Sequence, residues 1–135
     1  MVIPTEREFT KCCELEFDFL SEFGFVPGAG PKHRRSPYCV WFMREDISIV
    51  VSGEGYGTAA SASFETASHR LAPIFLVPEA DRPNLRVRRK EKDPGQLEQV
   101  SREASLIKQY CKDILEGDLS RFLELSKELP PYLLP

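Results

Sequence analysis

Three glycines spaced two residues apart, Gly53, Gly55 and Gly57, form the segment that most resembles a site for chemistry. Glycine loops bind phosphate when a lysine and a hydroxyl residue follow at fixed spacing, or when the loop leads into a helix. Here residues 58–65 follow, with no lysine and with small apolar and polar side chains in alternation. That alternation is typical of a strand. The spacing therefore predicts a hairpin turn, in which glycine supplies positive φ, and not a nucleotide site.

Cysteine and histidine are the next residue types that could do chemistry. The chain has Cys12, Cys13, Cys39, Cys111, His33 and His69. No Cys-x-x-Cys pair occurs, and neither histidine lies at ligand spacing from a carboxylate, so we predict no metal site. A Gly-x-Ser-x-Gly turn, which would hold a nucleophilic serine, is also lacking. We therefore predict no catalytic residue and no cofactor, and we expect reduced, mostly buried thiols.

Two basic clusters, at residues 32–35 and 86–92, could bind an anionic partner such as RNA. Tyr38 and Trp41 follow the first cluster and could stack on unpaired bases. The whole chain nevertheless has a net charge of −3, whereas nucleic-acid binding usually needs a basic face. An RNA-binding accessory is therefore an alternative and not the main prediction. We expect residues 82–93 to form an exposed connection.

The composition indicates a globular protein. The chain has 135 residues, of which 41% are hydrophobic and 29% are charged. This length predicts a single domain over residues 1–135, with residues 129–135 as a proline-rich tail. No apolar run reaches the roughly 18 to 20 residues that a membrane helix needs, and the N-terminus lacks the pattern of a signal peptide. We therefore expect a cytoplasmic protein with no membrane partner.

The first helix has clear boundaries in the sequence. Thr5 and Glu8 stand at the spacing of a capping box, in which each side chain accepts a hydrogen bond from the other residue's backbone. Apolar residues then recur at helical intervals as far as Phe23, and Gly24 follows as a natural stop. We expect one helix up to Phe23 that packs against a sheet.

Two further helices are expected near the C-terminus. Asp93 is placed to cap the first, which has apolar residues at steps of three and four and ends at Gly117. Asp118 is then placed to cap a shorter helix that runs to about Glu128. Between the N-terminal and C-terminal helices, the sequence predicts strands at 38–44, 47–52 and 58–65. Residues 69–78 contain prolines and predict an edge strand or an extended loop, and residues 26–37 predict a loop.

A family resemblance is carried by two segments. Residues 109–125, QYCKDILEGDLSRFLEL, resemble the closing motif of small uncharacterised bacterial α+β proteins, most specifically between Asp113 and Phe122. Residues 38–57, YCVWFMREDISIVVSGEGYG, resemble the hairpin of the same proteins. The resemblance implies an N-terminal helix, an antiparallel sheet and C-terminal helices. Some of these proteins are similar to immunity proteins of toxin systems, and the resemblance supplies no catalytic residues.

We therefore predict an α+β fold in which an antiparallel sheet of three to four strands is flanked by an N-terminal helix and two C-terminal helices, packed largely on one face. The main functional prediction is a non-enzymatic, bacterial, immunity-like module that binds another protein, with self-association left open. The predicted contact residues are Trp41, Glu45, Asp46, Glu54 and Tyr56. The alternative to this module and to RNA binding is a small ligand-binding protein or enzyme with a pocket between sheet and helices.

Overall fold

Six strands form one antiparallel sheet in the computed structural model of the chain, which describes residues 3–54, 57–82 and 95–133. The strands pair in their sequence order, so each lies beside its neighbour in the chain. They are Val26–Gly28 (β1), Cys39–Met43 (β2), Ser48–Glu54 (β3), Ala59–Glu65 (β4), His69–Leu71 (β5) and Lys127–Glu128 (β6). The last strand is far from β5 in sequence; it follows the helices in the chain and pairs with β5 at the edge of the sheet.

The prediction of three to four strands is wrong, although the α+β class and the antiparallel sheet are confirmed. The three long strands, β2 to β4, lie where alternation and β-branched residues placed them. The additional strands β1, β5 and β6 have three residues or fewer. Strands this short show no readable alternation. Their pairing is fixed by tertiary contacts: β1 forms inside the expected loop, and β5 lies between β4 and β6 instead of at an edge.

The strand register gives the sheet two different faces. In one row across the sheet, Phe42 lies opposite Ile49, which lies opposite Phe64, and all three side chains are buried. In the adjacent row, Trp41 lies opposite Val50, which lies opposite Ser63. Because neighbouring residues of a strand point to opposite faces, the first row faces the helices and the second faces away from them.

The N-terminal helix begins as predicted and then changes type. Helix α1 spans Glu6–Glu16, and its capping box is formed: the Thr5 hydroxyl accepts from the Glu8 backbone N–H at 3.1 Å, and the Glu8 carboxylate accepts from the Thr5 N–H at 3.0 Å. The helix does not continue as an α-helix to Phe23. A tighter 3₁₀ helix over Asp18–Phe23 completes the expected segment.

The long C-terminal helix is divided in the structure. Three α-helices, α2 (Gln96–Tyr110), α3 (Lys112–Leu115) and α4 (Ser120–Leu125), replace the expected two. The division falls at Cys111, whose φ of −118° and ψ of 27° depart from the helical region. Asp118, the expected cap of this helix, lies one position before its observed N-cap, Leu119, and its carboxylate accepts from the backbone N–H of Ser120 at 3.0 Å. The expected cap of α2, Asp93, lies outside the described residues.

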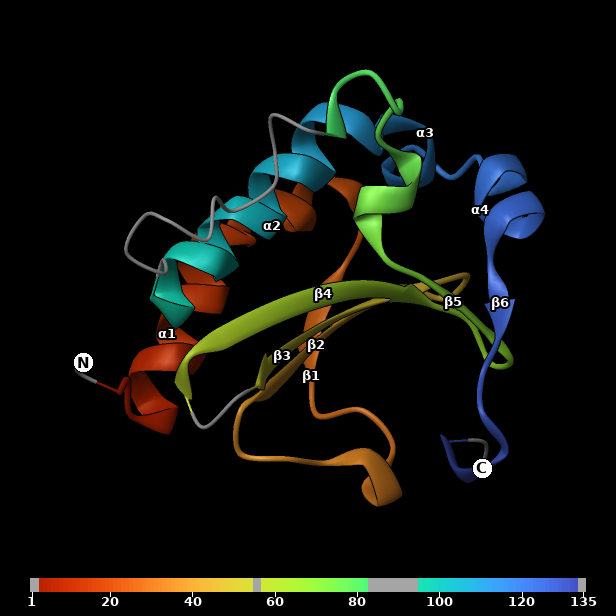
Figure 1. Cartoon of the computed structure of the whole chain (residues 1–135). Helices are drawn as coiled ribbons and strands as arrows, with labels where there is room; N and C mark the ends of the chain where they lie inside the picture. The colour runs from red at the N-terminus through yellow and green to blue at the C-terminus, as the bar shows by residue number, and fades with distance from the viewer. Residues whose placement is uncertain (1–2, 55–56, 83–94, 134–135) are drawn as a thin grey trace.

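Both long helices cover the same face of the sheet. Figure 1 shows α1 and α2 side by side above the strands, with the 3₁₀ helix Lys32–Arg34 and the C-terminal tail on the opposite side. The interface between helices and sheet is filled by a continuous apolar core. Its largest fully buried side chains include Phe9, Phe17, Phe25, Phe64 and Phe122. Each face of the sheet therefore has a separate role, with the core on the helix side.

The Glu103 side chain on α2 should make the stability of the fold depend on pH. Burial raises the pKa of the Glu103 carboxyl on α2 from the ordinary value of 4.5 to about 7, and the Glu54 charge adds to the effect. The folded state then holds this proton more tightly than the unfolded state, so the free energy of unfolding falls as the pH rises from 4.5 towards 7. The Glu103→Gln substitution replaces the carboxyl with a neutral amide, so the variant should not lose this stability as the pH rises.

We expect Glu103→Gln to raise the free energy of unfolding by about 2 kcal/mol near pH 8 and to change it little near pH 4. Urea denaturation of the variant and the wild type at both pH values measures the difference. The same effect at both pH values would show that the ionisation of Glu103 does not control stability.

Candidate functional site

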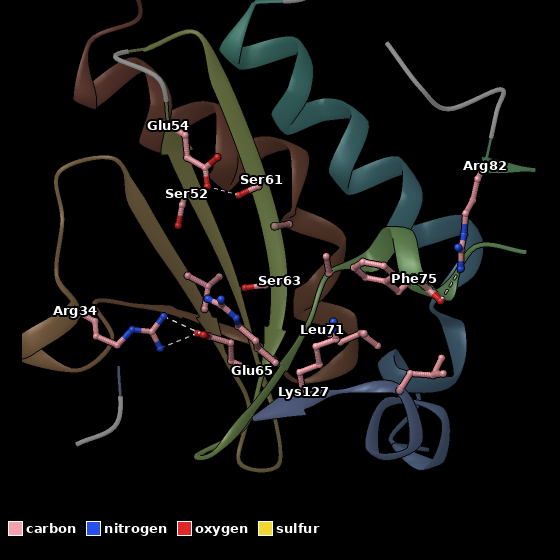
Figure 2. A pocket seen from close by; sticks show the side chains of 15 residues that line it. Arg34, Ser52, Glu54, Ser61, Ser63, Glu65, Leu71, Phe75, Arg82 and Lys127 are labelled. Atoms are coloured by element: carbon pink, nitrogen blue, oxygen red, sulfur yellow. Dashed lines mark hydrogen bonds and ion pairs between the residues drawn. The ribbon is translucent and has the colours of Figure 1, made fainter. Parts of the chain in front are cut away.

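The face of the sheet opposite the helices holds a pocket of about 520 Å³. This volume falls in the range of roughly 300 to 1,000 Å³ that is typical of ligand sites. Figure 2 shows the pocket side chains gathered along β4, with contributions from β3, β5 and β6. Because these strands are held from behind by the helical core, the pocket has a rigid floor.

Hydroxyl groups form the floor of this open-face pocket. Ser52, Ser61 and Ser63 belong to the outward positions of β3 and β4, and Ser52 lies directly opposite Ser61. The Ser61 hydroxyl donates to the Glu54 carboxylate at 2.9 Å. The Ser63 hydroxyl has no hydrogen-bond partner among the described residues, and the side chain points into the pocket in Figure 2. The floor therefore offers small polar groups to a ligand without a large side chain in the way.

A buried ion pair closes one side of the pocket. The Arg34 guanidinium donates to both carboxylate oxygens of Glu65, at 3.0 and 2.9 Å. Glu65 is only 3% exposed, so water barely reaches its carboxylate and Arg34 takes the place of water as its partner. The same guanidinium lies 5.0 Å from the centre of the Trp41 ring. Two-pronged contact with a carboxylate and stacking on an aromatic ring are both geometries that arginine favours over lysine.

Two cations on the other side of the pocket lack such partners. Arg70 on β5 lies directly opposite Lys127 on β6, and both are exposed side chains that line the pocket. Neither forms an ion pair or a side-chain hydrogen bond with another described residue. The described residues of the lining include four basic and two acidic side chains, which give this part of the pocket a net charge of +2. The pocket is therefore cationic in a chain whose overall charge is negative.

Apolar side chains form the rim beside these cations. Phe75 is 52% exposed and Leu125 is 44% exposed, and both line the pocket. Phe75 belongs to the 3₁₀ helix Pro73–Leu76, which Arg82 holds by donating to the Val77 carbonyl at 3.0 Å. An exposed aromatic ring beside unpaired charges is typical of a contact surface, because such a ring contributes much of the binding energy when it is covered.

The residues predicted from the sequence as contacts lie at two separate places: Trp41, Glu45 and Asp46 line one pocket together, whereas Glu54 lines another. Glu45 and Asp46 lie at the turn before β3, whereas Glu54 lies at its far end, roughly 20 Å away for a strand of this length. The Arg44 guanidinium donates to Asp46 and lowers the pKa of its carboxyl, so this acid is already paired. Glu54 does line the pocket, and Tyr56 lies outside the described residues.

Trp41 is on the open face, as expected, but its side chain is buried, with 5% exposure. A loop covers it: a Cβ atom at Gly30 would lie 2.5 Å from the Trp41 ring, and Gly30 has a φ of +71°. Arg34 covers the ring from another direction. In the structure Trp41 therefore supports the pocket through Arg34, and its own ring is largely covered. The predicted hairpin glycine is confirmed at Gly57, which has a φ of +90°.

Four residues of the pocket were not predicted from the sequence as a group: Arg34, Arg70, Phe75 and Lys127. The alternation in β4 did indicate a polar face, but it did not show that β5 and β6 would lie beside it. The first basic cluster now has structural roles: Arg34 is paired with Glu65, and the His33 ring nitrogen lies 3.2 Å from the Leu133 carbonyl. This weakens the RNA-binding alternative. The second basic cluster lies outside the described residues.

The pocket is not where the ligand-binding alternative placed it. The space between sheet and helices is filled by the core, whereas the pocket is on the opposite face. Its lining contains no histidine or cysteine, and within the described residues no group of His, Cys, Asp and Glu side chains could hold a metal ion. The described cysteines are unpaired, and burial raises the pKa of the Cys111 thiol to about 12.

Comparison with known proteins gave no match to a family model, a curated protein or a solved structure. The resemblance of residues 109–125 to small bacterial proteins stays a prediction. In the part of the chain that the structure describes, no helix has the length and apolar character needed to cross a membrane.

Proposed function

We propose that the protein is a non-enzymatic binding module that recognises another protein through the open-face pocket. The observation that carries this proposal is a pair of cations without a partner among the described residues, Arg70 and Lys127, beside the exposed rim residues Phe75 and Leu125. Charged groups combined with an exposed aromatic anchor are typical of protein interfaces, in which charge steers the partner and apolar contact holds it.

The polar groups of the pocket favour binding over catalysis. Glu65 is held on both oxygens by Arg34, and Glu54 accepts from Ser61. General acid–base catalysis needs a group that can exchange a proton with a substrate, and a nucleophile needs an adjacent base. Among the pocket hydroxyls, that of Ser61 comes closest to such a pair, because it donates to Glu54. Glu54, however, is an exposed residue at the end of β3. The pocket thus resembles a recognition surface more than a catalytic centre.

An immunity-like role is the specific form of this proposal that the sequence resemblance implies. The partner would then be a toxin that the module binds and blocks. Co-expression with the product of an adjacent toxin-like gene tests this form, because the module should restore growth. Failure to restore growth would remove the immunity role but leave open a binding module with another partner.

The proposal is tested by affinity purification of the tagged protein from cells of its source organism at physiological salt. The pocket variant is Phe75→Ser/Leu125→Ser, and the matched control is Leu15→Ser/Leu123→Ser, which changes exposed apolar residues that do not line the pocket. We expect wild type and control to retain one partner protein in equal amount. The pocket variant should lose about tenfold or more, since truncating an interface anchor costs 1 to 2 kcal/mol or more.

Recovery of no protein partner would contradict the proposal, as would equal recovery with the pocket variant. Circular dichroism of both variants checks that their folds are intact. Because all four side chains are exposed, neither variant should lose much stability.

A further inference from the structure

The charges of the pocket specify the chemistry of the partner. Resting on the proposed function, we infer that the partner inserts an acidic segment, with carboxylate groups on Arg70 and Lys127 and an apolar side chain against Phe75 and Leu125. The cationic end, the apolar rim and the acidic opposite end of the pocket each support this assignment.

The two cations at one end of the pocket repel each other, and a bound anion would relieve this repulsion. Arg70 and Lys127 occupy directly opposite positions on neighbouring antiparallel strands, and like charges in such positions repel each other. The acidic neighbour in the same row, Glu65, lies opposite Arg70 but has both oxygens bound to Arg34. Two exposed cations therefore share one side of the pocket without a described carboxylate to neutralise them.

The apolar rim adds a second requirement. Phe75 and Leu125 come from the segments that follow β5 and precede β6, so they border the strands that carry the two cations. A simple inorganic anion would leave both apolar side chains exposed to water. A segment with carboxylates and a neighbouring apolar residue would satisfy the charges and cover the rim together, and burial of the rim would contribute free energy in proportion to its area.

The opposite end of the pocket gives the segment a direction. Glu54 lies opposite Ala59, which is six positions before Glu65 on the same strand and roughly 20 Å away along it. An acidic group near Glu54 would meet a like charge, whereas a neutral or basic group would not. The segment therefore lies along β4 with its acidic part at the β5–β6 end, over the free Ser63 hydroxyl.

The test is a selection of short random peptides displayed on phage against the intact wild-type protein at physiological salt. The pocket variant is Arg70→Glu/Lys127→Glu; both side chains are exposed and have no partner among the described residues, and circular dichroism checks the fold because position 70 lies opposite Glu65. The matched control is Arg7→Glu/Lys11→Glu on α1, which reverses two exposed cations outside the pocket. Affinities of the selected peptides for the three proteins are measured by fluorescence polarisation.

We expect selected peptides to combine aspartate or glutamate with an apolar residue. They should bind the pocket variant at least tenfold more weakly than the control, because reversed charges repel an acidic segment. The inference would be overturned by selected peptides without acidic residues, or by the absence of any selected peptide whose binding depends on Arg70 and Lys127. A partner whose recovery still depends on Phe75 and Leu125 would then show that the proposed function survives and that only the assigned chemistry is wrong.

Discussion

Arg34→Ala is expected to lower the free energy of unfolding by about 3 kcal/mol, the low end of the cost of breaking a buried ion pair. The substitution leaves the Glu65 carboxylate, which is 3% exposed, without its two-pronged partner. It also removes the guanidinium that covers Trp41. A buried charge without a partner costs far more free energy than an exposed one. Breaking this pair should therefore destabilise the fold more than breaking one of the described surface ion pairs.

Urea denaturation followed by circular dichroism measures this loss, and Trp41, the only tryptophan, reports on its own environment by fluorescence. Two further variants make the test sharper. Arg70 lies opposite Glu65 and could partly replace Arg34, so Arg34→Ala should cost more when Arg70→Ala is also present. Replacing both partners, as in Arg34→Met/Glu65→Leu, should recover much of the loss. A loss below about 1 kcal/mol, the range of exposed ion pairs, would show that Glu65 does not depend on Arg34.

Arg44→Ala should produce a loss of similar size, about 3 kcal/mol, because several hydrogen bonds from one charged group disappear together. The Arg44 guanidinium donates to the carbonyls of Phe23, Ile114 and Leu115 at 3.1, 2.8 and 2.7 Å. It also lies 4.4 Å from the centre of the Phe25 ring. One side chain thereby joins the end of β2 to the end of the 3₁₀ helix Asp18–Phe23 and to the end of α3.

The comparison with Arg44→Lys separates charge from geometry. Lysine keeps the charge but cannot direct several N–H groups to fixed positions, so we expect it to recover less than half of the loss. Arg7→Ala, at an exposed position on α1, should change the free energy of unfolding by less than about 0.5 kcal/mol and serves as the control. Full stability of Arg44→Lys would show that the hydrogen bonds to the three carbonyls are not what stabilises this junction.

Local signals were sufficient to predict the parts of the fold that depend on neighbouring residues. The capping box at Thr5 needs only the spacing of Thr5 and Glu8, and it is formed. The strands β2, β3 and β4 are long enough for their alternation to be read, and they pair as predicted. In each case the interaction that stabilises the element lies within a few residues of the signal.

The short strands and the helix boundaries depend on distant residues and could not be predicted in this way. Lys127 and Glu128 were expected in a helix, but they pair with β5, nearly sixty positions earlier in the chain. No propensity in a segment of two residues indicates that choice. The break at Cys111 likewise has no local signal, since no glycine or proline marks it in the sequence.

The candidate site could be predicted only in part, because it too depends on residues that are distant in the sequence. Glu54 was predicted as a contact residue, and in the structure it is exposed and lines the pocket. Trp41 was expected to be exposed because β2 reads as a strand with one free face, yet the loop at Gly30 and Arg34 covers it. Arg70 and Lys127 lie opposite each other only because β6 pairs with β5, and neither local segment contains a signal for that strand pairing.

Site-specific photo-crosslinking tests most directly the claim that the open face of the sheet binds a protein partner. A photoreactive phenylalanine analogue is placed at Phe75, on the pocket rim, and in a separate protein at Leu15, on α1. After irradiation in cells of the source organism, we expect one discrete protein adduct from position 75 and none from position 15. Adducts from position 15 alone, or no adduct from position 75, would contradict the assignment of this pocket as the binding site.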